Sequence, residues 1–156
     1  MVGIPIDIVV CGLGSAPAVP VRMTRVEMGQ PFAVVVDYAH TPNALAKVLE
    51  HLRGHFRRGR LIAVNGASGY RVRKLPGLGE VSARLADYSV FTTNSPLMTD
   101  PTVLLSQLAA GAEAVGLRDE ESYTCIADRR EAIRFALSMA EANDCVLLAS
   151  KGTSRQ

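Results

Sequence analysis

The chain has 156 residues, 48% of them hydrophobic, a length that supports one buried core and is short for two independent domains. Its formal net charge of +2 is too small for a protein that binds nucleic acid through charge. No apolar run approaches the roughly 20 residues of a membrane helix, and Pro5 and Asp7 interrupt the apolar stretch near Met1. We therefore expect a soluble protein without a signal peptide, membrane insertion or a nucleic-acid partner.

The three cysteines, Cys11, Cys125 and Cys145, lack both CxxC spacing and neighbouring histidines. Each lies among apolar residues, so we expect three reduced cysteines in the core and no structural zinc or other metal site. Reduced cysteines are typical of a cytoplasmic protein.

The first segments in chain order are a short helix, a linker and a hairpin. Met1 to Leu13 is expected to form the helix, and Gly12 to Pro20, rich in Gly, Ala, Ser and Pro, the linker. Strand-forming residues then occupy Arg22 to Glu27 and Phe32 to Asp37, with the turn sequence Met28 to Pro31 between them. This pattern predicts an antiparallel hairpin that leads into a central strand.

Apolar runs typical of strands then alternate with amphipathic helical patterns. The predicted strands are Leu61 to Val64, Tyr88 to Thr92, Tyr123 to Ile126 and Cys145 to Ala149. The predicted helices begin near Pro42, Leu78, Pro101 and Arg129, and Asp100 and Asp128 have the chemistry of N-caps. The pattern indicates an α/β fold: a Rossmann-like, doubly wound, mainly parallel sheet of about six strands with one antiparallel edge hairpin.

In such sheets ligands bind outside the carboxyl ends of the strands, so the loops after the strands are the candidate site. These loops are expected at Asp37 to Pro42, Asn65 to Pro76, Thr93 to Asp100, Ala127 to Arg129 and Ser150 to Gln156. They contain Asp37, Tyr38, His40, Gly66, Gly69, Arg71, Arg73, Lys74, Asn94, Ser95, Lys151 and Gly152. Basic side chains and glycines at one edge suit a phosphorylated or carboxylated ligand.

Several of these residues also have plainer interpretations. Asp37 could cap the following helix, and His40 could be an ordinary loop histidine. The segment Gly66 to Gly69 is not a Walker A loop, because no GK[ST] follows it. Arg57, Arg58 and Arg60, like Arg71, Arg73 and Lys74 in the loop Asn65 to Pro76, could be solvated charges. Ser150 and Lys151 look like a catalytic Ser-Lys element, but no partner motif accompanies them.

Five motifs occur along the chain in a recognisable order. They are Gly3-Ile4-Pro5 through Gly12-Leu13, Val19-Pro20-Val21-Arg22-Met23, Asp37-Tyr38-Ala39-His40-Thr41-Pro42, Asp128-Arg129-Arg130-Glu131-Ala132-Ile133 and Lys151-Gly152. In these motifs the chain resembles the carboxyl-terminal domain of the Mur ligases, most closely the MurE type. The second motif is similar to V-P-G-R-M of that family, and the third is identical to its D-Y-A-H-T-P. The fourth resembles its D-R-x-E-A-I, and the fifth falls in its G-K-G-H-E segment.

The resemblance implies part of an ATP-dependent amide ligase of peptidoglycan precursor synthesis. In these enzymes ATP phosphorylates a carboxylate of UDP-MurNAc-L-Ala-D-Glu, and the amine of an incoming amino acid attacks the acyl phosphate. The partners implied are this UDP-MurNAc-dipeptide, the amino acid and the central ATPase domain, which holds most of the ATP and its magnesium. On this chain the matching nucleotide-side residues are Arg22, Asp37 and His40, with Tyr38 adjacent. No catalytic residue and no metal ligand is expected within the chain itself.

The pocket for the incoming amino acid matches the family less well. Arg71 retains the arginine of a G-G-D-R-D-x-G-K-R-P motif that is otherwise changed and one residue shorter. The D-N-P-R motif becomes Asn94-Ser95-Pro96-Leu97, and leucine cannot form a bidentate clamp on a carboxylate. In the last motif Ser150 and Ser154 stand where the family has a glycine and a glutamate. The amino-acid side would therefore consist of Arg71, Ser95, Leu97, Ser150 and Ser154.

The resemblance also implies a division of the chain. Residues 1–20 would be the lead-in helix and linker from the central ATPase domain, and residues 21–156 the carboxyl-terminal domain without its last strand and helix. Because the chain has no Walker A sequence, we expect it to be inactive alone and to act within a larger ligase. The alternative is a non-catalytic nucleotide-binding or protein-interaction module derived from such a ligase.

Overall fold

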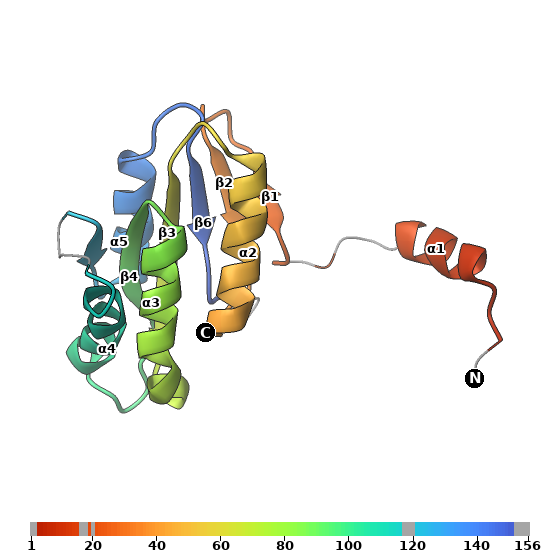
Figure 1. Cartoon of the computed structure of the whole chain (residues 1–156). Coiled ribbons are helices and arrows are strands. Elements are labelled where there is room, and N and C mark those ends of the chain that lie inside the picture. The colour runs from red at the N-terminus through yellow and green to blue at the C-terminus, as the bar shows by residue number, and fades with distance from the viewer. Residues whose placement is uncertain (1–2, 16–18, 20, 117–120, 152–156) are drawn as a thin grey trace.

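A six-stranded sheet forms the centre of the computed structural model, which describes residues 3–15, 19, 21–116 and 121–151 (Figure 1). Its strands are β1 (Thr24–Val26), β2 (Ala33–Val36), β3 (Leu61–Ser68), β4 (Tyr88–Ser95), β5 (Tyr123–Cys125) and β6 (Cys145–Leu148). Their order across the sheet is β1-β2-β6-β3-β4-β5. Only β1 is antiparallel to its neighbour, and the other pairs are parallel. The predicted mainly parallel sheet with an antiparallel edge hairpin is therefore confirmed.

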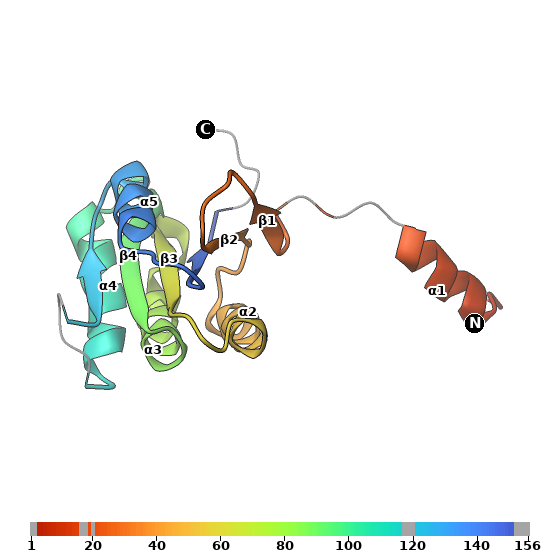
Figure 2. The ribbon, with the colours of Figure 1, turned by 90° about the horizontal axis from the view of Figure 1, so that it is seen from above.

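The direction of the connections decides which face each helix covers. From β2 to β3, β4 and β5 the chain moves across the sheet in one direction, and right-handed crossovers place α2 (Pro42–His55), α3 (Leu75–Leu85) and α4 (Pro101–Glu113) on one face. The connection from β5 to β6 runs back the other way. The same handedness therefore places α5 (Arg129–Ser138) on the opposite face, as Figure 2 shows. This is the predicted doubly wound arrangement.

Each face of the sheet has its own core. On one side the leucines of α2, α3 and α4 pack on Ala63, Phe91 and Leu147, and on the other Ala132 and Ala136 of α5 pack on the valines and isoleucine of the central strands. Strands β3 and β6 are covered on both faces, which explains why their sequences are continuously apolar rather than alternating.

The helix starts were predicted correctly where an aspartate caps the helix, and one other start was wrong. Asp100 and Asp128 cap α4 and α5, accepting hydrogen bonds from the amides of Thr102 (2.8 Å) and Glu131 (2.9 Å), as predicted. The predicted start of α3 near Leu78 was wrong. The helix begins at Leu75, with Pro76 in its first turn where proline is well tolerated, and a 3-10 segment, Gly69–Lys74, precedes it.

Strands β3 and β4 are longer than predicted and run on to Ser68 and Ser95, so the two loops expected after them begin later. The predicted end of β3 came from Asn65, a polar residue that is in fact buried within the strand. Asn65 Nδ2 donates to Ser82 Oγ (2.7 Å), and this hydroxyl lies 2.6 Å from Ser89 Oγ. A buried polar residue with a partner is compatible with a strand interior.

The cysteine prediction was wrong at two positions. Cys145 is buried in β6, and burial raises the pKa of its thiol to about 12. Cys11 and Cys125 are exposed. The apolar neighbours of Cys11 are themselves exposed on α1, and Cys125 is the last residue of the edge strand β5, so local apolarity did not indicate burial there.

The lead-in helix, α1, spans Ile6–Ser15 and so begins and ends later than the predicted Met1 to Leu13. It buries no residue of its own and lies apart from the sheet in Figures 1 and 2. Ile6, Val10 and Leu13 are among its exposed apolar side chains. Glycines at positions 12 and 14 did not end the helix.

A buried carboxylate, Asp144, ties the beginning of β6 to the beginning of β3. It accepts bonds from the Arg60 amide (2.7 Å), from Arg60 Nε (3.0 Å) and Nη2 (2.8 Å), and from the Glu141 amide (3.0 Å). Burial alone would raise the pKa of Asp144, but these donors lower it below the ordinary value of an aspartate. Arg60 is therefore a structural anchor rather than a solvated loop charge.

We predict that Asp144→Asn lowers the free energy of unfolding by about 1 to 3 kcal/mol at neutral pH, because an amide cannot accept all of these bonds. The folded pKa of Asp144 lies below the roughly 3.9 of an unfolded aspartate. Its contribution is therefore full above that pH, and the difference between variant and native chain shrinks as pH falls through the folded pKa. Urea unfolding from pH 7 to pH 3 measures this, with the exposed-site variant Asp7→Asn as control; equal stability of both variants at pH 7 contradicts the prediction.

Candidate functional site

A cavity of about 560 Å³ lies at the carboxyl ends of four neighbouring strands. The residues that line it follow or end β2, β3, β4 and β6; they are Tyr38, His40, Ser68, Tyr70, Arg71, Asn94, Ser95, Ser150 and Lys151. The predicted site residues Tyr38, His40, Arg71, Ser95 and Ser150 are thus brought together from four separate parts of the chain.

Tyr38 and His40 form one wall of the cavity, and Arg22, which does not line the cavity, stacks on Tyr38. The Arg22 guanidinium lies 5.2 Å from the centre of the Tyr38 ring, and the rings of Tyr38 and His40 are 4.5 Å apart. His40 Nδ1 is 2.8 Å from the Tyr38 carbonyl oxygen, so a ligand contact would fall to Nε2. Such a stack offers flat surfaces and donors to a purine or a phosphate.

Asp37 holds the two backbone segments that carry this stack. It is buried, its Oδ2 accepts from the Met23 amide (2.9 Å), and its Oδ1 accepts from the Ala39 amide (2.8 Å). The interpretation of Asp37 as a helix cap was wrong, because Thr41 Oγ1 caps α2 by accepting from the Ala44 amide (3.3 Å). Asp37 instead ties the segment that carries Arg22 to the loop after β2.

The segment after β6 is fixed by polar contacts to both neighbours. Ser150 is buried in the left-handed backbone region (φ 73°), and its hydroxyl donates to the Ala39 carbonyl (3.1 Å). Asn94 Nδ2 donates to the carbonyls of Ser150 (3.0 Å) and Gly66 (3.3 Å). Because the Ser150 hydroxyl is engaged in this way, the structure favours an anchoring role over a Ser-Lys nucleophile.

The predicted amino-acid side is only partly assembled. Arg71 and Ser95 line the cavity, and a break in the 3-10 segment at Arg71 (φ −135°, ψ 31°) separates its backbone from the helical residues around it. Leu97 does not line the cavity; it is 49% exposed on the loop after β4, with φ 57°. Ser154 lies outside the described residues.

A second hollow adjoins the first through Lys151, which lines both. Arg129, in the first turn of α5, contributes to it and donates from Nη2 to the Ala149 carbonyl (2.9 Å). Its Nη1 is buried without a partner in the described part of the chain. Burial lowers the pKa of Arg129 to about 10, so the group stays cationic at neutral pH. The site therefore carries positive charge from both sides of β6.

Asn94, which also lines the cavity, was expected in the candidate loops but without a specific role, and Ser68 and Tyr70, which line it too, were not singled out. Asn94 and the polar end of β3 were visible as polar residues after apolar runs. Their shared location depends on β3 and β4 being paired in register to Ser68 and Ser95, which the sequence alone did not predict.

The described residues contain no group of three His, Cys, Asp or Glu side chains placed to hold a metal ion. Over the same residues, no helix combines the length and the apolar composition needed to cross a bilayer. Fold and site together define a doubly wound α/β domain with a cationic, aromatic-lined cavity at the carboxyl edge of its sheet, a site suited to an anionic ligand.

The chain belongs to the Mur ligase family, whose glutamate ligase domain matches residues 21–152. A UDP-N-acetylmuramyl-tripeptide synthetase of Roseiflexus sp. (strain RS-1) is 44% identical over 96% of this chain. A UDP-N-acetylmuramoyl-L-alanyl-D-glutamate--2,6-diaminopimelate ligase of Alkaliphilus metalliredigens (strain QYMF) is 41% identical over 97%. The chain spans 30% of the length of each of these relatives.

Solved structures agree with this assignment. A UDP-N-acetylmuramoyl-L-alanyl-D-glutamate--2,6-diaminopimelate ligase superposes with a TM-score of 0.71 at 34% identity, over 96% of this chain and 30% of that one. A Mycobacterium tuberculosis folylpolyglutamate synthase, complexed with ADP and AMPPCP, superposes with a TM-score of 0.70 at 19% identity, over 96% of this chain and 33% of that one. The second likeness shows a shared fold.

We predict that Gly66→Ala disturbs the site. A Cβ at Gly66 would lie 2.1 Å from Asn94 Oδ1 and so displace the side chain that holds Ser150. The free energy of unfolding should fall by about 1 to 3 kcal/mol. The matched control is Gly54→Ala in α2, where a Cβ meets nothing within 4 Å and should stabilise by about 0.5 to 1 kcal/mol. Chemical denaturation of both variants measures this; a Gly66→Ala chain as stable as the native one contradicts it.

Proposed function

We propose that this chain is the carboxyl-terminal domain of a longer, ATP-dependent MurE-like amide ligase of peptidoglycan precursor synthesis. The observation that carries the proposal is the single cavity at which the ends of four strands place Tyr38, His40, Arg71, Ser95 and Ser150. In the reaction, ATP phosphorylates the carboxylate of a UDP-MurNAc-dipeptide, and the amine of an amino acid displaces phosphate from the acyl phosphate. The parent enzyme would act in the cytoplasm.

Under this proposal the residues of the cavity divide into two sides. Arg22, Tyr38 and His40 contact the nucleotide by stacking and by neutralising phosphate charge, and Asp37 holds them in place through its two backbone bonds. Arg71 faces the same space and binds the carboxylate of the incoming amino acid. Magnesium and the phosphate-binding loop belong to the preceding ATPase domain of the parent enzyme.

The proposed division of the chain follows from α1. Its apolar side chains, including Ile6, Val10 and Leu13, are exposed, and an apolar helix face of this kind is stable in water only when another surface covers it. Residues 1–20 would therefore pack as the last helix and linker of the ATPase domain. Residues 21–156 would form the domain that closes over the nucleotide.

Lys151 and Arg129 extend the positive charge on the nucleotide side. Lys151 lines the main cavity and the adjoining hollow, and Arg129 is held behind it by the Ala149 carbonyl. Positive charges at fixed positions stabilise negative charge that develops on a phosphoryl or acyl group without reorganising during the reaction. We assign both residues to charge stabilisation rather than to proton transfer.

The test is an amide-ligation assay on the full-length enzyme that contains this chain, with ATP, the UDP-MurNAc-dipeptide and a panel of amino acids. We predict that Arg71→Ala raises the KM for the accepted amino acid about tenfold to a hundredfold and leaves the KM for ATP unchanged, because it removes a charge-assisted contact. The matched control is Arg73→Ala, equally exposed and of equal charge but outside the cavity.

The alternative, a non-catalytic module, predicts that the full-length protein forms no amide bond with any amino acid of the panel. It is favoured if nucleotide still binds and His40→Ala weakens that binding. Equal effects of Arg71→Ala and Arg73→Ala would instead show that the ligase is real but that the amino-acid side is placed wrongly.

We also predict that the full-length enzyme does not use meso-diaminopimelate efficiently, although relatives such as the one from Alkaliphilus metalliredigens are named diaminopimelate ligases. Leu97 and Ser154 replace an arginine and a glutamate of the family's motifs. Each lost contact corresponds to roughly 1.5 to 3 kcal/mol, or about two to four orders of magnitude in selectivity together. Steady-state kinetics with diaminopimelate measure this, and Leu97→Arg with Ser154→Glu should restore part of the activity. Kinetics equal to those of an ordinary diaminopimelate ligase contradict it.

A further inference from the structure

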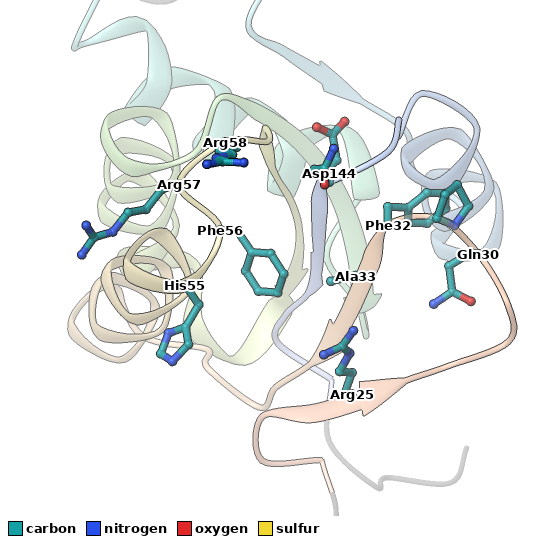
Figure 3. Close-up of a pocket in the computed structure, with 11 residues that line it drawn as sticks. Arg25, Gln30, Phe32, Ala33, His55, Phe56, Arg57, Arg58 and Asp144 are labelled. Carbon is teal, nitrogen blue, oxygen red and sulfur yellow. The ribbon is translucent and has the colours of Figure 1, made fainter.

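A separate cavity, of about 420 Å³, lies at the opposite end of the strands, where β2 and β6 begin (Figure 3). It is bounded by β1, by the last residues of α2 and by the loop that leads into β3. None of its lining residues takes part in the proposed ligase site. It therefore has to be explained separately.

The charge of this cavity is strongly positive. Arg25, Arg57 and Arg58 line it, and Asp144 is the one carboxylate among its described lining residues. Asp144 is buried and forms an ion pair with Arg60, which does not line the cavity. This pair neutralises the charge of the carboxylate. Arg25 pairs with Glu27 at 2.9 Å, but both side chains are more than half exposed, and exposed pairs hold their partners weakly. Arg25 can therefore turn to a ligand at little cost.

An aromatic surface stands between these charges. Figure 3 shows the Phe56 ring between Arg25 and Arg58. Phe56 packs against the core and its amide donates to the Leu52 carbonyl (2.8 Å), so the ring has a fixed place at the end of α2. A flat apolar group could lie on it while an attached anion reaches the arginines.

The loop that carries Arg57 and Arg58 is held rigidly. A Cβ at Gly59 would lie 1.9 Å from the Asn143 carbonyl oxygen, so the two loops touch through their backbones. Arg60, one residue further on, is fixed to Asp144 through its amide and guanidinium. Arg57 Nε donates to the Gly54 carbonyl (3.2 Å). Charges on a fixed loop bind an anion with a smaller loss of conformational entropy than charges on a mobile one.

We propose that this cavity is a second ligand site, which binds a phosphomonoester carried on a flat apolar group. Arg25 and Arg58, on either side of Phe56, match the two negative charges of a phosphomonoester better than the single charge of a carboxylate, whereas Arg57 points away from the ring in Figure 3. Phe56 selects the group attached to the phosphate. The site is independent of the proposed ligase function, because it occupies the other end of β2 and β6.

The experiment titrates the ¹⁵N-labelled chain with phenyl phosphate and follows amide chemical shifts, with inorganic phosphate and phenol as separate arms. We expect saturable shifts at Phe56, Arg58 and Asn143, and affinities about tenfold weaker for phosphate alone and for phenol alone. Arg25→Gln with Arg58→Gln should weaken phenyl phosphate about tenfold or more. The matched control, Arg84→Gln with Arg134→Gln, removes two exposed helix arginines of equal charge and should change nothing.

Three outcomes overturn the proposal. They are the absence of saturable shifts around Phe56, an equal loss of affinity in both double variants, and shifts confined to residues 37–40 and 149–151. The last would place the anion in the candidate ligase site. Thermal unfolding of each variant, and Arg58→Gln alone as a milder change, separate loss of binding from loss of folding.

Discussion

The insertion of β6 between β2 and β3 is the constraint on which the site depends. Its pairing places Leu148 opposite both Val36 and Val64, and the bonds from the Asp37 amide to the Leu148 carbonyl (3.1 Å) and from the Ala149 amide to the Val64 carbonyl (2.9 Å) continue the ladder beyond the strand. Residues more than a hundred positions apart in sequence thereby become neighbours. Without this pairing the loop after β2 and residues 149–151, which follow β6, would not be neighbours.

The same constraint concentrates positive charge in fixed positions. Arg129 is half-buried, with one bond to Ala149, and its Nη1 is buried without a partner among the described residues. A buried cationic donor without a partner is costly, and a bound anion would offset that cost. Ser150 adopts a left-handed backbone conformation, and its hydroxyl donates to the Ala39 carbonyl. The core, in which β3 and β6 are covered on both faces, stabilises the fold against these unfavourable local features. Strained or unpaired groups of this kind cluster at functional sites in other proteins.

The fold could be predicted because its signals are local. Alternating strand and helix patterns gave the sheet type, and Asp100 and Asp128 gave two helix starts. Burial that depends on distant residues could not be predicted. The apolar neighbours of Cys11 are exposed, and Asn65 lies buried in a strand where its Nδ2 donates to Ser82, on another element, while its Oδ1 has no partner among the described residues. Tyr38 and His40 were found from a motif, whereas Asn94 acts through contacts to Gly66 and Ser150 that exist only in the folded sheet. The cavity at the start of the strands depends entirely on such long-range contacts.

The central claim is that four strand ends form one site for nucleotide and amino acid. Hydrogen–deuterium exchange of the full-length ligase, with and without an ATP analogue, the UDP-MurNAc-dipeptide and the amino acid, tests it most directly. The account predicts that ligand slows exchange together in residues 37–41, 69–72, 94–96 and 149–151, the segments around the cavity. Slowing elsewhere in this domain, with those four segments unchanged, would contradict it.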